Sequence, residues 1–173
     1  MYILPVCGGE AEKVTDVKTS VINYEWRRDG KMIAFTMADA ADDNEEKNKK
    51  AKNDWYFMDE EIKQNRLYIL WLDEKDTAGK YVQKKLTKST GSGEENYNVN
   101  AFDWSANGKS IVFSHGLSPE VNHNIYSDIS MIEIETGKIK LIANTAAGET
   151  NPQFSPDGKL IVYYCTADPT NYH

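Results

Sequence analysis

The alternation of apolar and polar positions repeats three times along the chain, over residues 26–35, 104–113 and 154–163. Each segment has an aromatic residue, two spacer residues, Asp-Gly or Asn-Gly, a lysine and then a short apolar run. The three segments align without gaps. The repeat predicts three copies of one β-hairpin, in which Trp26, Trp104 and Phe154 occupy equivalent positions.

The residues around each turn explain why a hairpin is expected. Asp-Gly and Asn-Gly accept the positive φ angles of a two-residue hairpin turn. The apolar run that follows is nearly continuous, as at residues 111–113, and such runs are typical of strands covered on both faces. We therefore expect the apolar side chains after each turn to be mostly buried. These residues are Ile33, Phe35, Ile111, Phe113, Ile161 and Tyr163.

Further pairs of strands complete the repeating unit. The two strands of each hairpin are here called A and B. Strands C and D follow the first hairpin at residues 67–72 and 81–87, and the second hairpin at residues 129–134 and 138–143. Residues 1–7 and 10–16, around Gly8-Gly9, have the pattern of C and D alone, and the third hairpin supplies A and B. The predicted order C-D, A-B-C-D, A-B-C-D, A-B is all-β. It indicates a partial β-propeller of about three four-stranded blades over residues 1–173, with WD-like repeats.

The spacing of the turn glycines predicts an insertion in the first complete blade. A blade takes roughly 40–45 residues, and the interval from Gly30 to Gly108 is much longer than that. Residues 38–63 account for the excess, because they are rich in charge and carry few apolar residues besides 55–58. We expect a charged loop between strands B and C, anchored by its aromatic residues.

Composition and charge exclude several classes of partner. The formal net charge is −7 and the pI is about 5.0, which disfavours nucleic-acid binding. No apolar run is long enough to span a bilayer, so no membrane contact is expected. The two cysteines, Cys7 and Cys165, lie in apolar strand-like runs, which favours buried structural thiols over a disulfide framework or a metal site.

Two short motifs imitate active-site elements. Gly108-Lys109-Ser110 resembles the end of a phosphate-binding loop, but Asp103 stands where the motif needs glycine and a strand follows, so a hairpin turn is expected. Ser114 and His115 are adjacent in sequence, but neighbouring strand residues point to opposite faces and cannot form a catalytic pair. His115 and His123 are expected to be polar loop residues.

The acidic residues offer weak candidates for binding. The stretch Asp39–Glu46 lacks the glycine and the spaced acceptors of a calcium loop, which favours a solvated loop over a cation site. Glu60 and Glu61 could hold the amino terminus of a peptide, and they suit an exposed loop equally well. No catalytic residue, cofactor ligand or metal ligand is assigned, and substrate-binding residues stay open.

The repeat also resembles known propellers. Residues 154–163 resemble the blades shared by the prolyl oligopeptidase family of serine peptidases and the periplasmic Tol-system propeller protein, and residues 8–16 look like the blade-closing stretch of both. The charged insertion, with residues 59–63 and 65–70, is more similar to the acylaminoacyl-peptidase branch. The resemblance covers nearly the whole chain.

The resemblance implies two functions of different classes. In the peptidase family, the propeller gates and filters peptide substrates for a hydrolase domain, which this chain does not contain. The nucleophile of that family lies in a G-x-S-x-G elbow, and Gly91-Ser92-Gly93 has the wrong spacing. The parent would be a serine peptidase, although this chain would be non-catalytic. The alternative is a Tol-like scaffold for protein–protein interaction, and a cytoplasmic or a periplasmic location suits these readings.

Unpaired strands at both ends of the chain predict self-association. Exposed strand edges are normally covered, and residues 1–16 have the right type to complete the blade begun by residues 151–164. Twelve strands from each of two chains would form a closed six-bladed ring with two-fold symmetry. We therefore expect a homodimer.

Overall fold

The structure is a computed structural model, and it describes residues 1–41, 47, 63–87, 96–120 and 126–166. This part of the chain forms twelve β-strands. Their bounds are β1 Tyr2–Ile3, β2 Glu12–Lys13, β3 Val21–Trp26, β4 Met32–Ala38, β5 Asn65–Lys75, β6 Tyr81–Lys85, β7 Asn98–Trp104, β8 Ser110–Gly116, β9 Asp128–Glu133, β10 Ile139–Ala143, β11 Glu149–Phe154 and β12 Ile161–Cys165.

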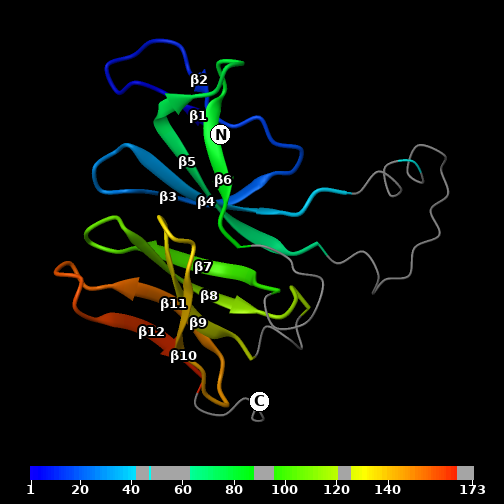
Figure 1. The fold of residues 1–173 in the computed structure, drawn as a ribbon, viewed down its shortest axis with the longest axis vertical. Helices are drawn as coiled ribbons and strands as arrows, with labels where there is room; N and C mark the ends of the chain where they lie inside the picture. Colours follow the sequence, from blue (N-terminus) through cyan, green and yellow to red (C-terminus); the bar gives the residue numbers. More distant parts are fainter. Residues whose placement is uncertain (42–46, 48–62, 88–95, 121–125, 167–173) are drawn as a thin grey trace.

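The strands form four antiparallel sheets in the predicted order (Figure 1). Strands β1 and β2 pair as the first half-blade, and β3-β4-β5-β6 make the second blade. Strands β7-β8-β9-β10 make the third blade, and β11-β12 make the last half-blade. Every pairing is antiparallel between neighbours in sequence, which is the meander of a propeller blade. The expected series of C-D, two complete blades and A-B is confirmed, but β1 and β2 are much shorter than the strands predicted at residues 1–7 and 10–16.

Strand register confirms that the three hairpins are equivalent. Trp26 lies opposite Ile33, Trp104 opposite Ile111 and Phe154 opposite Ile161. Strand β8 begins at Ser110, directly after the turn. Gly108-Lys109-Ser110 is therefore part of a hairpin, as expected, and not a phosphate-binding loop.

The turns differ from the predicted two-residue type. The glycine N–H donates to the carbonyl three residues earlier, as from Gly108 to Ser105 at 2.8 Å, and the glycine alone has a positive φ, 65° at Gly108. Asn107 keeps a negative φ, and its Oδ1 accepts the Lys109 N–H at 3.0 Å. The Asp or Asn of each turn therefore contributes a hydrogen bond from a backbone N–H to its side chain. In this longer turn only the glycine adopts the left-handed conformation.

The apolar runs are covered on both faces because blades stack face to face. In β4, Met32 and Ala34 join a core between the second and third blades, while Ile33 and Phe35 pack with Val14 of the first half-blade. Alternate side chains of one strand therefore enter two different cores. Ile33, Phe35, Ile111 and Phe113 are at most 2% exposed, as predicted.

The prediction of burial is wrong for the third hairpin. Ile161 is partly exposed and Tyr163 is 39% exposed, because the described chain has no strand beside the free edge of β12 to extend the sheet over them. Cys165 ends this open strand β12, whereas Cys7 lies in the loop after β1 and not in a strand. Cys7 and Cys165 are both exposed, whereas the sequence predicted buried ones.

Successive blades also fit together through their A–B turns. A Cβ on Gly108 would lie 2.7 Å from Cδ of Arg27, and a Cβ on Gly158 would lie 3.2 Å from Cβ of Ala106. Gly30 occupies the same place in the first hairpin and has no heavy atom within 4 Å of such a Cβ. The turn glycine therefore receives the turn of the preceding blade wherever the described chain has one.

Candidate functional site

The connections divide between two edges of the blades. The A–B turns of β3-β4, β7-β8 and β11-β12 lie together at the left of Figure 1, opposite the end of β4 and the start of β5. The long connections, residues 39–64, 86–97 and 117–127, follow strands B and D and so leave from the other edge. Long loops carried by a rigid scaffold are the usual place for binding residues.

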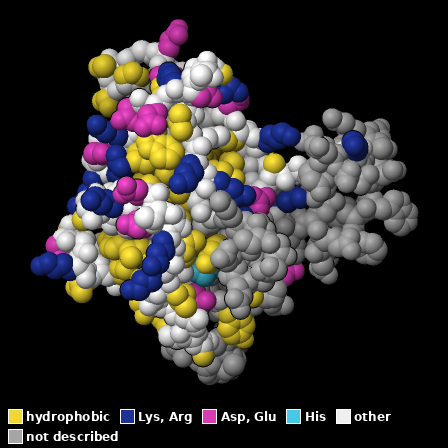
Figure 2. Space-filling view, viewed as in Figure 1, with side chains coloured by type: hydrophobic (Ala, Val, Ile, Leu, Met, Phe, Trp, Pro, Cys, Tyr) yellow, Lys and Arg dark blue, Asp and Glu magenta, His cyan; other side chains and the backbone are white. Residues whose placement is uncertain are grey.

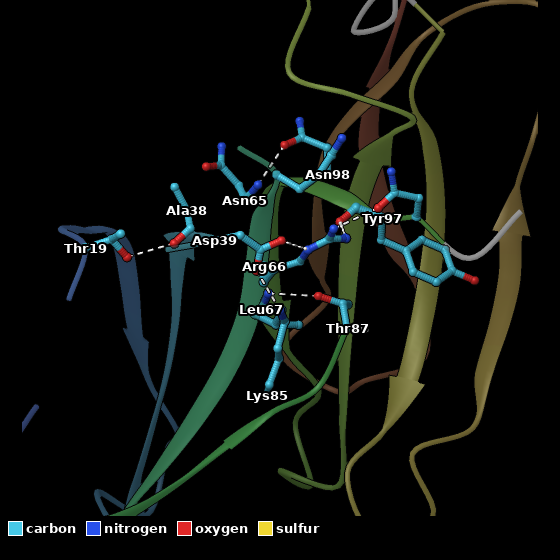
Figure 3. Close-up of polar contacts among 12 residues, drawn as sticks. Thr19, Ala38, Asp39, Asn65, Arg66, Leu67, Lys85, Thr87, Tyr97 and Asn98 are labelled. Carbon is cyan, nitrogen blue, oxygen red and sulfur yellow. Dashed lines mark hydrogen bonds and ion pairs between the residues drawn. The ribbon is translucent and has the colours of Figure 1, made fainter. Parts of the chain in front are cut away.

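A buried arginine ties two of these connections together (Figure 3). Arg66, in β5, is 1% exposed, and its Nε donates to Oδ2 of Asp39 at 2.8 Å. One terminal nitrogen donates to the Tyr97 carbonyl at 2.9 Å and the other to Oδ1 of Asn96 at 2.7 Å. The guanidinium thus joins the start of residues 39–64 to the end of residues 86–97. Removing one partner of such a buried pair is strongly destabilising.

Asp39 is an ion-pair partner and not part of a solvated acidic loop. Its Oδ1 accepts from Nζ of Lys85 at 2.6 Å, in addition to the Arg66 bond. Burial works against its charge, but the hydrogen bonds from Lys85 and Arg66 outweigh burial and lower the pKa of Asp39. The rest of the acidic stretch, residues 42–46, lies outside the described residues, as do Glu60, Glu61 and Gly91-Ser92-Gly93.

His115 lines a small cavity at this edge of the third blade. The cavity is about 90 Å³ and also contacts Tyr97, Tyr126 and Asp128. Nε2 of His115 lies 2.8 Å from Oγ of Ser130, and its ring meets Tyr97 edge-on with centroids 4.6 Å apart. Burial lowers the pKa of His115 to about 4, so the ring is neutral at neutral pH.

The neighbours of His115 do not supply a catalytic pair. Ser114 is fully buried, and its hydroxyl has no partner among the described residues. The two side chains point to opposite faces of β8, as the sequence predicted. The expectation that His115 is a loop residue is wrong, because it lies within β8. His123 falls outside the described residues.

The innermost strands carry a polar groove that was not predicted from the sequence. It has a volume of about 370 Å³ and is lined by residues of β3, β7 and β11, among them Glu25, Asp103, Asn151 and Gln153. Burial, and then a hydrogen bond with Asp103, raise the pKa of Glu25 to about 7. Glu25 is therefore partly protonated near neutral pH, and its hydrogen bond with Asp103 favours that form.

The groove residues also link one blade to the next. The Glu25 carboxylate accepts the backbone N–H of Trp104, and Oδ2 of Asp103 accepts the backbone N–H of Phe154 at 2.6 Å. The position directly before the repeat's aromatic residue is occupied by Glu25, Asp103 and Gln153. The gap-free alignment of the three repeats therefore already showed that this position is polar in each. A polar acceptor at this position satisfies the N–H of the next blade.

Within the described ranges, no three His, Cys, Asp or Glu side chains are placed to hold a metal ion. The described residues include no helix long and apolar enough to cross a membrane.

Four-stranded antiparallel blades, stacked face to face with polar inner strands, make this chain part of a β-propeller. Solved structures agree. TolB from Acinetobacter baumannii matches with a TM-score of 0.53 and 17% identity, over 94% of this chain and 31% of that chain. A putative TolB from Agrobacterium tumefaciens matches with a TM-score of 0.57 and 18% identity, over 94% of this chain and 45% of that one. A structure from a study of two prolyl endopeptidases matches with a TM-score of 0.54 and 17% identity, over 91% of this chain and 21% of that chain.

The chain is also similar in sequence to a peptidase. The chain is 28% identical over 171 residues to the uncharacterized peptidase YuxL of Bacillus subtilis (strain 168). The match covers 99% of this chain and 19% of that relative, so the chain spans about a fifth of the length of the curated protein it resembles. No protein-family model matches the chain. The resemblance to peptidase propellers and to the Tol-system propeller is confirmed.

Proposed function

We propose that this chain is the non-catalytic propeller region of a serine peptidase of the prolyl oligopeptidase family, and that it filters peptide substrates for a hydrolase domain outside the chain. The observation that carries the proposal is the match to a peptidase along 99% of the chain but only 19% of that peptidase. The likeness to the prolyl endopeptidase structure supports the same fold. The acylaminoacyl-peptidase branch is part of the proposal.

The arrangement of side chains suits filtering better than catalysis. The inner strands present amides and carboxyl groups along a groove of about 370 Å³, and such groups can bind peptide backbone reversibly. Ser114, which stands beside His115 in the sequence, is fully buried and has no access to a substrate. Hydrolysis needs an activated nucleophile and an oxyanion hole, and the proposal places both in the hydrolase domain.

The proposal is tested with the full-length protein that contains this chain. Its remaining sequence should hold a G-x-S-x-G elbow followed by Asp and His. Hydrolysis should be measured on a series of unstructured peptides of increasing length, with the elbow Ser→Ala variant as the control. We expect kcat/KM to fall at least tenfold beyond a limiting length. Equal rates for all lengths would contradict filtering, whereas a full-length protein without hydrolytic activity would contradict the peptidase assignment.

The 173-residue chain alone provides a second test. It should not hydrolyse peptide or ester substrates, and Ser114→Ala should change nothing. Turnover by the purified chain that follows one of its own residues would place the chemistry here and contradict the proposal.

The alternative function is a Tol-like scaffold for protein–protein interaction. Its support is the similarity in fold to the two TolB structures. A full-length protein without the elbow and without hydrolytic activity would favour this alternative.

A further inference from the structure

We infer that the 173-residue chain forms a closed two-fold ring in which the last half-blade of each copy fills an apolar hollow on the first half-blade of the other. The inference concerns this chain by itself and does not depend on the proposed peptidase function. The contacts expected between the two copies are the same kinds of contact that join neighbouring blades within one chain.

The hollow lies beside the first half-blade. It has a volume of about 290 Å³ and is lined by apolar residues of β1, β3 and the start of β4, with Val14. Tyr24 and Trp26, which form one wall, are 64% and 44% exposed. Figure 2 shows hydrophobic side chains at the upper left of the view, over the dark blue loop that joins β1 to β2 in Figure 1, and a second hydrophobic group below them. A contiguous apolar surface of this kind marks an interaction site.

The occupant is indicated by the strands that each half-blade lacks. Among the described residues, β1 and β2 are strands C and D without A and B, and β11 and β12 are strands A and B without C and D. The outer face of the last half-blade is apolar and open, since Leu160, Val162 and Tyr164 are 71%, 65% and 70% exposed. The hairpin β11-β12 of a second copy would supply strands A and B to the first half-blade. The apolar outer face of that hairpin would then be covered by the hollow.

The hydrogen bonds that link successive blades also stop at the first and last half-blades. Glu25 accepts the Trp104 N–H and Asp103 accepts the Phe154 N–H, which leaves Gln153 as the next acceptor in the series. At the other end, the N–H of Trp26 is the equivalent donor. Likewise, Gly158 receives Ala106, while Gly30 faces open space. In the ring, Gln153 and Pro156 of one copy meet Trp26 and Gly30 of the other.

The internal repeat also fixes the register of the new pairing. Val14 N–H donates to the Met1 carbonyl at 3.1 Å, as Leu86 N–H donates to the Leu67 carbonyl at 2.8 Å, so Met1 corresponds to Leu67. Ile3 then corresponds to Ile69, which lies opposite Ala34 in the second blade. Ala34 corresponds to Val162 in the last hairpin. Strand β12 should therefore pair with β1 of the second copy with Val162 opposite Ile3.

Mass measurement gives the first test. Light scattering should give twice the chain mass of 19.6 kDa. Val162→Asp should give a monomer at the same concentration, because it places a charge against the hollow. Leu141→Asp is the matched control, since Leu141 is 51% exposed on the outer strand β10, and it should stay dimeric. Circular dichroism checks that both variants remain folded.

Crosslinking tests the register. In a chain with Cys7→Ser and Cys165→Ser, the pair Ile3→Cys and Val162→Cys should form an intermolecular disulfide on mild oxidation. Tyr2→Cys with Val162→Cys should not, because adjacent strand residues point to opposite faces. A wild-type monomer would overturn the inference. So would a dimer that persists in Val162→Asp without the crosslink, or a mass that grows with concentration beyond two copies.

Discussion

The hairpins β7-β8 and β11-β12 have the same sequence pattern but opposite environments. In the first, Trp104 is 4% exposed and Phe113 is fully buried; in the second, Tyr163 is 39% exposed and Val162 is 65% exposed. The difference comes from position, because blades cover β8 on both faces while β12 has one open face and a free edge. A repeat pattern therefore specifies a strand and its register, and the neighbouring blades specify its burial.

The largest expected effect is a difference in stability between equivalent core positions. Phe113→Ala should lower the free energy of unfolding by about 3–5 kcal/mol, because it leaves a cavity in a filled core. Tyr163→Ala, at the same repeat position, should cost about 1 kcal/mol or less, as expected for a surface residue. Urea unfolding of both variants in the monomeric Val162→Asp background provides the measurement. Equal losses would show that burial does not follow position in the array.

A smaller effect is expected at the turn glycines. Gly108→Ala and Gly30→Ala both place a side chain at positive φ, 65° and 71°, which costs of order 1 kcal/mol or more. Gly108→Ala should cost about 1 kcal/mol beyond Gly30→Ala, because its Cβ would lie 2.7 Å from Cδ of Arg27. Thermal unfolding in the same monomeric background compares the two, with Gly79→Ala as a control at φ 75° in open space. A Gly30→Ala variant less stable than Gly108→Ala would contradict the packing of turn on turn.

The smallest expected effect concerns the raised pKa of Glu25 beside Asp103. The pKa of Glu25 is about 7 in the folded chain, above the usual 4.5 of a glutamate, so Glu25 keeps its proton to higher pH in the folded chain than in the unfolded one. The free energy of unfolding contributed by this group therefore falls as the pH rises from about 4.5 to 7. Glu25→Gln, which copies Gln153 of the last hairpin, should gain less than about 1 kcal/mol relative to wild type between pH 5 and pH 8, because solvent screens this half-exposed group.

The pH measurement needs two controls. His115 acts in the opposite direction, because its lowered pKa makes the folded chain more stable as the pH rises from about 4 to 6.5. Each pH point is therefore taken as the difference between variant and wild type. Glu74→Gln on β5 tests the loss of an exposed carboxyl. Identical pH profiles for Glu25→Gln and wild type would show that the pKa of Glu25 is not raised in the folded chain.

The sequence predicted much less of the candidate site than of the fold. Arg66 stands in a strand as one of many basic residues, and nothing near it in sequence shows that Asp39, Asn96 and Tyr97 surround it. Glu25 and Asp103 lie far apart in the chain and meet only because the inner strands of adjacent blades lie side by side. Interactions between distant segments depend on how the sheets stack, which local patterns do not encode.

The sequence by itself determined the strands, their order and the equivalence of the three hairpins, because turn residues and apolar runs act over a few neighbouring positions. It did not determine the turn type, the openness of Cys7 and Cys165, or the exposure of Ile161 and Tyr163. Tertiary structure decided the burial of those side chains, since burial depends on whether another sheet lies against each face. It also decided the pKa of Glu25, because desolvation and a carboxyl neighbour arise only when two blades meet.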